Sequence, residues 1–501
     1  MHTLPFPTRL APALLALSLA GCTLGPDFVR PTPATPESWT SWRSDDAALP
    51  IPADAGQAPP AQWWLAFNDP TLDELQQRAF VASPDLRTAA LLFSQSRTQR
   101  ASVAAQRGPE VGISSNTARQ RESEHGAGTR MIDIMGSMPG INQRLAEPFT
   151  LYHAGLDASW ELDLWGRVRR SVEAADADIE QHAALLDLAH LSLASEVAQH
   201  YLELRTTQRQ RVLLGQDIAA LEQRTDLLQA RVDGGVLDHT DLQRQRAELA
   251  ALKAQRPPLL AQEAASANQI TLLLGQHPGT LQAVLAAAPQ DVPTALPDLA
   301  LGLPSEVALR RPDIRAALAR LHRATASIGI AQADLYPSIR LGANFGFQSY
   351  LSGELSEWGS RTWSVGPGIS LPLFDQGRRR ATVQLRQLQQ QEAAVEYQKT
   401  VLKAWQEIDD ALSAYSAEQQ QAHELRLRSD AANQAYLLAQ ARFDGGITDF
   451  TVVLDSLRSC LLARRELAAS QGRLGSHYVM INKAIGNTPG LQHEHRRPVS
   501  E

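Results

Sequence analysis

The chain of 501 residues has little cysteine, few aromatic residues and no excess of positive charge. Its two cysteines rule out a disulfide framework and any zinc or iron–sulfur site built on cysteine. Asp and Glu number 54 against 47 Lys and Arg, and no basic stripe forms, which argues against nucleic-acid binding. Beyond the start of the chain no run of about 18 or more apolar residues occurs, which excludes a polytopic helical transporter but not a β-barrel.

The motifs of several enzyme classes are also missing. We find no glycine loop for nucleotides, no HExxH metal helix and no GxSxG nucleophile elbow, so we expect neither an enzyme nor a cofactor. What the chain does contain is 44% hydrophobic residues, and long stretches dominated by Ala, Leu, Gln and Arg. This composition indicates a folded protein with extended helices.

The first residues have the pattern of a secretion signal. Arg9 precedes an apolar segment, Leu10 to Gly21, that would span about 18 Å as a helix, too short to cross a bilayer. Because this segment ends at Cys22 in a sequence resembling the bacterial lipobox, we predict a signal peptide over 1–21 and lipidation of Cys22. An ordinary signal peptide with an incidental cysteine is the alternative. An Asp directly after the cysteine would resemble the signal that retains lipoproteins in the inner membrane. Thr23 stands there instead, which implies the outer membrane. Residues 22–60 are predicted to form a lipidated, extended strap.

The chain also repeats itself. Ala230–Val236 returns as Ala441–Ile447, an offset of 441 − 230 = 211, and Pro84-Asp85-Leu86 returns as Pro312-Asp313-Ile314, an offset of 312 − 84 = 228. The difference, 228 − 211 = 17, places an insertion in the first copy between residues 109 and 155. We predict two structural repeats, 61–290 and 291–487, followed by a disordered tail over 488–501.

Each repeat holds a pair of segments with alternating polarity. The alternation is clear in residues 152–164, 339–347 and 363–373, and weak in residues 109–119, and polar residues and glycine crowd 112–143 as in a long loop. Segments of about ten residues behind a signal peptide favour a transmembrane barrel over a soluble, half-buried sheet. Four strands cannot close a barrel in lipid, so the chain must oligomerise, as a dimer with eight strands or a trimer with twelve.

Long helices fill the rest of each repeat. Between Gly377 and Arg442 no proline intervenes, and about 65 residues would span about 100 Å. Leu388, Val395 and Leu402 recur at the seven-residue spacing of a coiled coil. In the first repeat, Pro257-Pro258 is predicted to break or offset the helix that starts near Leu242.

Five motifs occur in order along the chain: Gly25-Pro26-Asp27-Phe28, Trp63-Trp64 with Asn68-Asp69-Pro70, Leu162–Arg167, Leu303–Ile314 and Leu371–Arg378. Together they resemble the motifs of TolC-type outer-membrane efflux factors, in particular the lipoprotein branch that serves resistance-nodulation-division pumps. The resemblance implies a mainly α fold with a membrane β part: a homotrimer with a twelve-stranded outer-membrane barrel above a periplasmic helical barrel. It also implies a passive exit duct for drugs or other small toxic molecules, supplied by an inner-membrane pump through a periplasmic adaptor.

The same resemblance suggests residues at the periplasmic constriction. Thr240 and Asp241 match one half of a hydrogen-bonded latch, and Asp455 matches a pore-lining aspartate. Phe443 replaces the latch tyrosine, and a phenyl ring cannot donate the hydrogen bond. Thr448 replaces an arginine and Val452 a second aspartate, so the latch differs here while an Asp455 ring is expected. A solvated carboxylate on a helix face is the alternative for Asp455.

Three other features have plain structural explanations. Cys460 is expected to be a small buried group, and His493 and His495 to belong to the disordered tail. Glu161 and Asp163 could suggest acid–base chemistry, but a hydrated barrel lumen explains them as well. The alternative functions are a type I protein-secretion duct, a trimeric coiled-coil surface lipoprotein and a soluble periplasmic lipoprotein enzyme. No residue indicates the substrate.

Overall fold

The computed structural model describes residues 23–32, 35, 36, 39, 53, 54, 59–126, 130, 134, 140–235, 238–286 and 299–489. The predicted signal peptide, Cys22 and most of the predicted tail lie outside these residues. The chain divides into two compact units. The first, here the strand unit, comprises Met1–Val29, Ser96–Ile179 and Arg320–Ala394, and the second, the helical unit, comprises Arg30–Gln95, Glu180–Ala319 and Val395–Glu501. Each unit therefore draws on both repeats.

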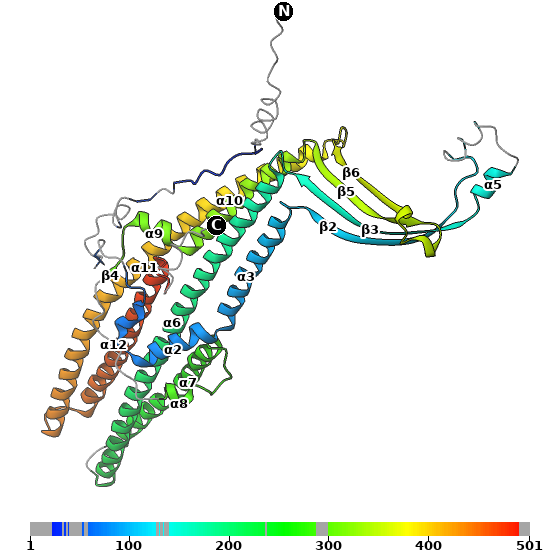
Figure 1. Cartoon of the computed structure of the whole chain (residues 1–501). Coiled ribbons are helices and arrows are strands. Elements are labelled where there is room, and N and C mark those ends of the chain that lie inside the picture. The colour runs from blue at the N-terminus through cyan, green and yellow to red at the C-terminus, as the bar shows by residue number, and fades with distance from the viewer. Residues whose placement is uncertain are drawn as a thin grey trace, which may run out of the picture. The chain divides into compact units, whose positions relative to one another are not determined.

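The helices confirm the duplication (Figure 1). Helices α6 (Arg167–Asp233) and α11 (Arg378–Asp444) have 67 residues each, and their starts differ by 378 − 167 = 211. Helices α7 (His239–Leu273) and α12 (Phe450–Ala484) have 35 residues each and the same offset, 450 − 239 = 211. Helices α3 (Pro84–Ala105) and α10 (Pro312–Ala333) start 312 − 84 = 228 residues apart. Among the described helices, none is both long and apolar enough to span a membrane.

Shorter elements connect these helices. They are the helices α2 (Pro70–Ala82), α5 (Ile141–Leu145), α8 (Gln282–Leu285) and α9 (Pro304–Arg310), and the 3₁₀ turns η1 (Trp63–Phe67), η2 (Ser352–Glu354) and η3 (Trp358–Ser360). Strands β1 (Ala53–Asp54) and β4 (Leu299–Ala300) pair in parallel.

Of the break or offset predicted at Pro257-Pro258, the break is wrong, because α7 continues through both prolines. Two prolines in a helix leave the carbonyls of Lys253 and Ala254 without their usual amide donors. All four residues are exposed, so water can hydrate these carbonyls and the helix does not have to end.

The strand unit contains a four-stranded sheet. Its strands are β2 (Glu110–Gln120), β3 (Phe149–Leu162), β5 (Ser338–Ser349) and β6 (Arg361–Ser370), in the antiparallel order β2-β3-β5-β6. The weakly patterned segment is therefore a strand, and the polar connection predicted to begin near residue 112 starts only after Gln120.

The two faces of this sheet differ in chemistry. The register places opposite residues on one face of an antiparallel pair, for example Phe345 against Trp363 and Asn344 against Ser364. One face, here the apolar face, carries Val111, Ile113, Leu156, Ala158, Trp160, Ile339, Leu341, Ala343, Phe345, Phe347, Trp363, Val365 and Ile369. The other, the polar face, carries Ser114, Asp157, Ser159, Glu161, Arg340, Asn344 and Ser364, with several glycines. The apolar face is exposed to an unusual degree: Trp363 is 68% and Ile369 is 70% accessible in the single chain.

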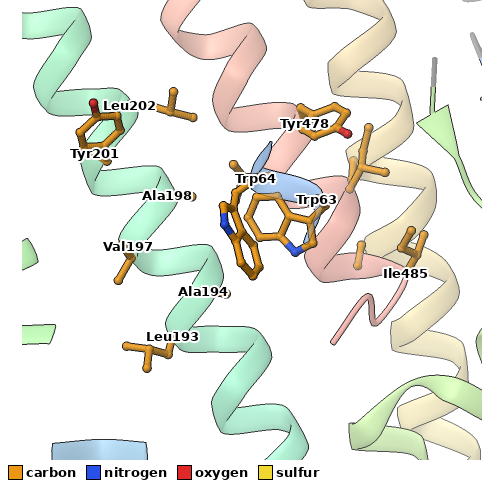
Figure 2. Packing of buried hydrophobic residues seen from close by; sticks show 14 of the residues in the cluster. Trp63, Trp64, Leu193, Ala194, Val197, Ala198, Tyr201, Leu202, Tyr478 and Ile485 are labelled. Carbon is orange, nitrogen blue, oxygen red and sulfur yellow. The ribbon is translucent and has the colours of Figure 1, made fainter. Parts of the chain in front are cut away.

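The core of the helical unit is built around the tryptophans of η1. Trp63 is fully buried and meets Trp64 edge to face with their rings 5.6 Å apart, among side chains of α6 and α12 that include Tyr201 and Tyr478 (Figure 2). Asp69 then caps α2 by accepting the amide of Thr71 at 2.9 Å, and it also accepts the hydroxyl of Tyr201. The motif from Trp63 to Pro70 is thus a packing anchor followed by a helix cap.

Candidate pore constriction and strand-to-helix junction

Two glycine turns end the long helices of the helical unit. Gly235 follows α6 with φ of +72°, and Gly446 follows α11 with φ of +71°, a left-handed conformation that suits glycine. Buried apolar side chains from all four helices pack behind the turns: Leu228, Val232, Leu242, Ala439, Phe450, Val453 and Leu454. The repeated sequence motif therefore produces two similar helical hairpin tips.

Phe443 is held at its tip by its ring. The side chain is half-buried, its ring lies 5.5 Å from that of Phe450, and the guanidinium of Arg231 sits over it at 5.5 Å from the ring centre. Arg224 stacks on Phe450 in the same way at 5.0 Å, and burial lowers the pKa of Arg224. Cation–π contacts thus join α6 to the second hairpin at both Phe443 and Phe450. Sequence reasoning missed both arginines, although Arg231 belongs to the repeated motif itself.

Thr240 and Asp241 lie in the first turn of α7. Asp238, which the sequence analysis did not single out, caps this helix and accepts the backbone amide of Thr240 at 3.3 Å. Hydrogen bonds from Thr240 lower the pKa of Asp238. Asp241 faces Arg244 at 3.7 Å on its own helix. Within the described part of the chain, no hydrogen bond or ion pair joins Thr240 or Asp241 to Phe443 or Asp455.

Asp455 lies in the second turn of α12. Its side chain is 71% exposed, and the nearest cation is Arg458 on the same helix, 4.0 Å away. Arg458 is itself bound by Glu248 of α7 at 2.6 Å. The carboxylate of Asp455 is therefore weakly held within one chain and is largely exposed to solvent.

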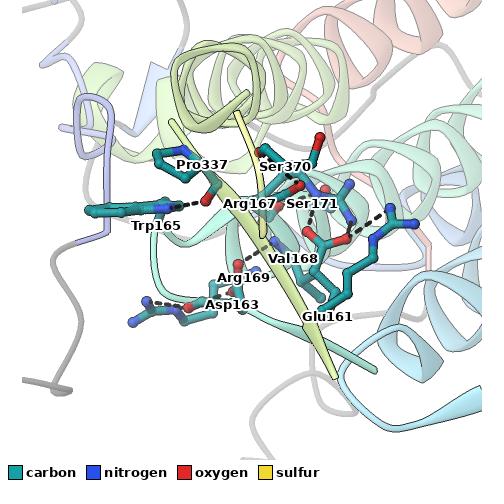
Figure 3. A network of polar contacts seen from close by, with 11 residues as sticks. Glu161, Asp163, Trp165, Arg167, Val168, Arg169, Ser171, Pro337 and Ser370 are labelled. Carbon is teal, nitrogen blue, oxygen red and sulfur yellow. Dashed lines mark hydrogen bonds and ion pairs between the residues drawn. The ribbon is translucent and has the colours of Figure 1, made fainter. Parts of the chain in front are cut away.

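The strand unit contains a junction where β3 leads into α6 (Figure 3). Arg167 binds both oxygens of Glu161, at 2.7 and 3.0 Å, and Arg340 approaches the same carboxylate at 3.5 Å. Asp163 accepts the amides of Val168 at 2.9 Å and Arg169 at 2.8 Å, so it serves as the cap of α6. These contacts assign Glu161 and Asp163 to structure and need no acid–base role.

The residues that follow Cys22 are docked on this junction. The amide of Leu24 donates to the carbonyl of Trp165 at 3.1 Å, and Arg170, only 5% exposed, binds the carboxylate of Asp27 at 2.7 Å. A Cβ on Gly25 would lie 2.4 Å from the Cα of Gly329, so only glycine fits there. Phe28 stacks on His322 at 4.3 Å. The motif Gly25–Phe28 is thus a docking segment, in which Gly25, Asp27 and Phe28 contact α6 or α10.

Comparison with known proteins decides the family. The model of the outer membrane efflux protein family matches residues 75–276 and 303–487. The chain belongs to this family. It is 30% identical to outer membrane protein OprJ of Pseudomonas aeruginosa over 480 residues, which cover 94% of each chain. It is also 30% identical to the toluene efflux pump outer membrane protein TtgC of Pseudomonas putida, with 95% of each chain covered.

Solved structures agree with this assignment. The outer-membrane channel OprN has a TM-score of 0.81 and 33% identity, and the match covers 93% of this chain and 99% of that one. The open state of the outer membrane channel MtrE of Neisseria gonorrhoeae has a TM-score of 0.74 and 28% identity, with 93% and 98% covered. The resemblance and the fold class predicted from the sequence are thus confirmed. The chain is an efflux channel of the outer membrane.

Proposed function

We propose that three copies of the chain close one twelve-stranded barrel and form a passive exit duct. The observation that carries this proposal is the sheet itself. Strands β2 and β6 are its two edges, and one face is apolar and exposed along its length. In lipid, unpaired edges would leave backbone groups without partners, whereas pairing β6 of one copy with β2 of the next satisfies them.

The source of the cargo is the second part of the proposal. An inner-membrane pump of the resistance-nodulation-division class delivers drugs or other small toxic molecules, and a periplasmic adaptor joins the pump to the duct. Relatives named for a toluene efflux pump and for an antibiotic efflux pump support a small-molecule cargo. The duct itself performs no enzymatic reaction on its cargo.

Molar mass tests the shared barrel directly. The full chain, extracted in detergent, is expected to elute as a trimer by light scattering and to form conducting pores in planar bilayers. A monodisperse monomer that conducts with full β content would overturn the shared barrel. A trimer that conducts but does not restore drug resistance in a strain lacking its own channel would overturn the small-molecule cargo.

We further propose that Asp455, Asp241, Thr240 and Phe443 line the periplasmic constriction of this duct. The exposed carboxylate of Asp455 and the position of all four residues at the hairpin tips support this assignment. Because Phe443 binds Arg231 through its ring, the tips are held by apolar and cation–π contacts instead of a tyrosine latch.

The ends of the chain form the last part of the proposal. Residues 1–21 are a signal peptide, Cys22 carries the lipid anchor, 22–60 form the strap, and 488–501 form the tail outside the repeats 61–290 and 291–487. The docked segment after Cys22 supports an anchor at this place. Labelled palmitate should enter the wild type and not Cys22→Ser. Incorporation that persists in the variant would remove the anchor from the proposal.

A further inference from the structure

Arg361 is a charged residue on the apolar face of β5 and β6. It opposes Phe347 in the register, and the next residues of its own strand on that face are Trp363 and Val365. A cation on a lipid-facing strand is costly at the midplane of a bilayer but is tolerated near the interface. The position of Arg361 along the strand therefore decides what it can contact.

Connectivity places Arg361 at the outer rim. The helices of the strand unit join the strands at the ends marked by Glu110, Leu162, Ser338 and Ser370. Arg361 is the first residue of β6 and lies at the opposite end, beside the connection that carries η2 and η3. From Arg361 to Ile369 the strand advances about 27 Å, or about 20 Å in height at a tilt of about 40°. The apolar residues between them fill the lipid-facing band.

The guanidinium of Arg361 is positioned but not neutralised. It stacks over the ring of Trp358 at 4.6 Å from the ring centre and donates to the carbonyl of Trp358 at 2.8 Å. In the described part of the chain it forms no ion pair with a carboxylate, although Glu354 and Glu357 lie in the same connection. Trp358 is 68% exposed, as expected of an aromatic residue at a membrane interface.

A second arginine shares this face and this end. Arg119, the penultimate residue of β2, opposes Thr150 and falls on the side of Val111 and Ile113. Closing the barrel brings β6 of one copy beside β2 of the next, so both arginines belong to one outward-facing rim. An apolar surface edged by unneutralised guanidinium groups is complementary to an anionic amphiphile, and the guanidinium fork matches a phosphate group.

We propose that Arg361 and Trp358, with Arg119 of the adjoining edge, bind the phosphate group of an outer-leaflet lipid whose acyl chains lie on the apolar face. This inference rests on the proposed barrel, because it requires that face to meet lipid. The lipid would hold its position at the joint between copies, where two edges of the sheet meet.

Native mass spectrometry of the detergent-solubilised trimer tests this site. The probes are lipid A with both phosphates and the same lipid after removal of its phosphates. The wild type is expected to bind the phosphorylated lipid about tenfold more tightly, since hydrogen bonds to charged groups are the strong ones. R361A should lose this preference, R361K should keep part of it, and R119A should weaken it. R340A, which removes an arginine from the polar face, is the matched control and should leave the preference for the phosphorylated lipid unchanged.

Other outcomes would overturn the site. Equal binding by wild type and R361A would do so, as would competition by inorganic phosphate alone, which would indicate a free-anion site. If R361A does not assemble, R361K and Trp358→Leu give the same comparison with a folded trimer. A spin label at V365C in a C460S background separates the two proposals. A label inaccessible to oxygen dissolved in lipid would refute the barrel itself, whereas an accessible label without phosphate preference would refute only the lipid site.

Discussion

Arg311 shows how one residue of a recognition motif holds several elements of the helical unit. Its side chain is 6% exposed, it donates to the carbonyl of Ala484 at 2.6 Å, and it binds both Asp313 and Glu407 at 2.6 Å. Burial on its own would lower the pKa of Arg311, but the hydrogen bonds that it donates to Asp313 and Glu407, together with their charges, raise it overall. The arginine thus joins the start of α10, the middle of α11 and the end of α12. Sequence reasoning recognised Arg311 by resemblance, but only the structure shows what it binds.

Arg311→Met should therefore destabilise the helical unit by about 3 kcal/mol, because it removes the ion pairs with Asp313 and Glu407 and the donor to the buried carbonyl of Ala484. Arg311→Lys should recover only part, since an ammonium cannot reach all three groups as a planar fork does. The midpoint of thermal helix loss by circular dichroism measures the effect. Arg320→Met, at an exposed pair with Glu392 3.7 Å away, is the control and should shift it little.

Asp217 is a buried carboxylate, and its contribution to the free energy of unfolding depends on pH. It is 4% exposed on α6, and burial raises its pKa even though Arg464 and Arg465 lower it. When a folded-state pKa lies above the unfolded value, stability is highest at low pH and falls as pH rises through the folded-state pKa.

Asp217→Asn should thus raise the unfolding midpoint at pH 7, and this gain should vanish below about pH 3.8, where the unfolded acid is also protonated. Urea titrations of the trimer at several pH values provide the measurement. A gain that is constant with pH would show that ionisation of Asp217 is not its cause.

Asp455 gives the residue-scale test of the constriction. If three carboxylates meet in the pore, they concentrate cations there, and Asp455→Asn should weaken cation selectivity at nearly the same width. Raising the salt from about 0.1 M to about 1 M shortens the Debye length from about 10 Å to about 3 Å and should mute the wild-type preference. Reversal potentials in planar bilayers report the change. Unaltered selectivity in a conducting trimer would leave Asp455 as a solvated helix residue.

At the scale of elements, α11 carries an apolar seam that its own chain does not cover. Leu388, Val395 and Leu402 are 54%, 63% and 68% exposed, whereas Trp405 and Leu412, further along the same helix, are buried. A seven-residue repeat left exposed on a long helix is suited to packing against a second copy.

Leu402→Glu is accordingly expected to weaken the trimer by placing a charge in the contact between copies. Gln421→Glu, also exposed on α11 but out of step with the seven-residue repeat, adds the same charge on a different face and should leave the trimer intact. The trimer fraction after mild heating in detergent, read by electrophoresis, compares them. Equal loss in both variants would point to net charge as the cause and not to the seam.

Most elements could be predicted because their signals are local. The repeat offset of 211 fixed the matching of α6 with α11, and alternation identified three strands clearly. The polarity pattern of strand β2 is weak because Ser115, Thr117 and Arg119 occupy positions on its apolar face. Its pairing with β3 stabilises the strand where its own sequence pattern does not. A break in α7 is predicted from its two prolines because helix propensity counts the hydrogen bonds that proline removes. It does not count the hydration of the exposed carbonyls, which compensates for those bonds. The cation–π contacts of Phe443 join helices far apart in the chain, so no local pattern could show them.

For the whole molecule, the two-faced sheet makes the sharpest prediction. Val365→Lys places a charge on the apolar face, and Ser364→Lys places the same charge on the polar face of the same strand. A lipid-facing lysine near the midplane costs about 2–4 kcal/mol, so only Val365→Lys should reduce trimers in the outer-membrane fraction. Equal yields of the two variants would mean that neither face meets lipid.

The docking of Thr23 to Phe28 has a consequence for how the protein sits in its membrane. Thr23 packs against Gly166, and consecutive α-carbons are about 3.8 Å apart. Under the proposed lipidation, the acyl group on Cys22 would therefore be attached within one residue of a docked position. The lipid would restrict the position of the strand unit along the membrane normal, because any vertical movement of the unit would pull the acyl chains against the leaflet. Inserting glycine and serine residues between Cys22 and Thr23 would lengthen this connection. It would relax the restriction on vertical position without changing any strand.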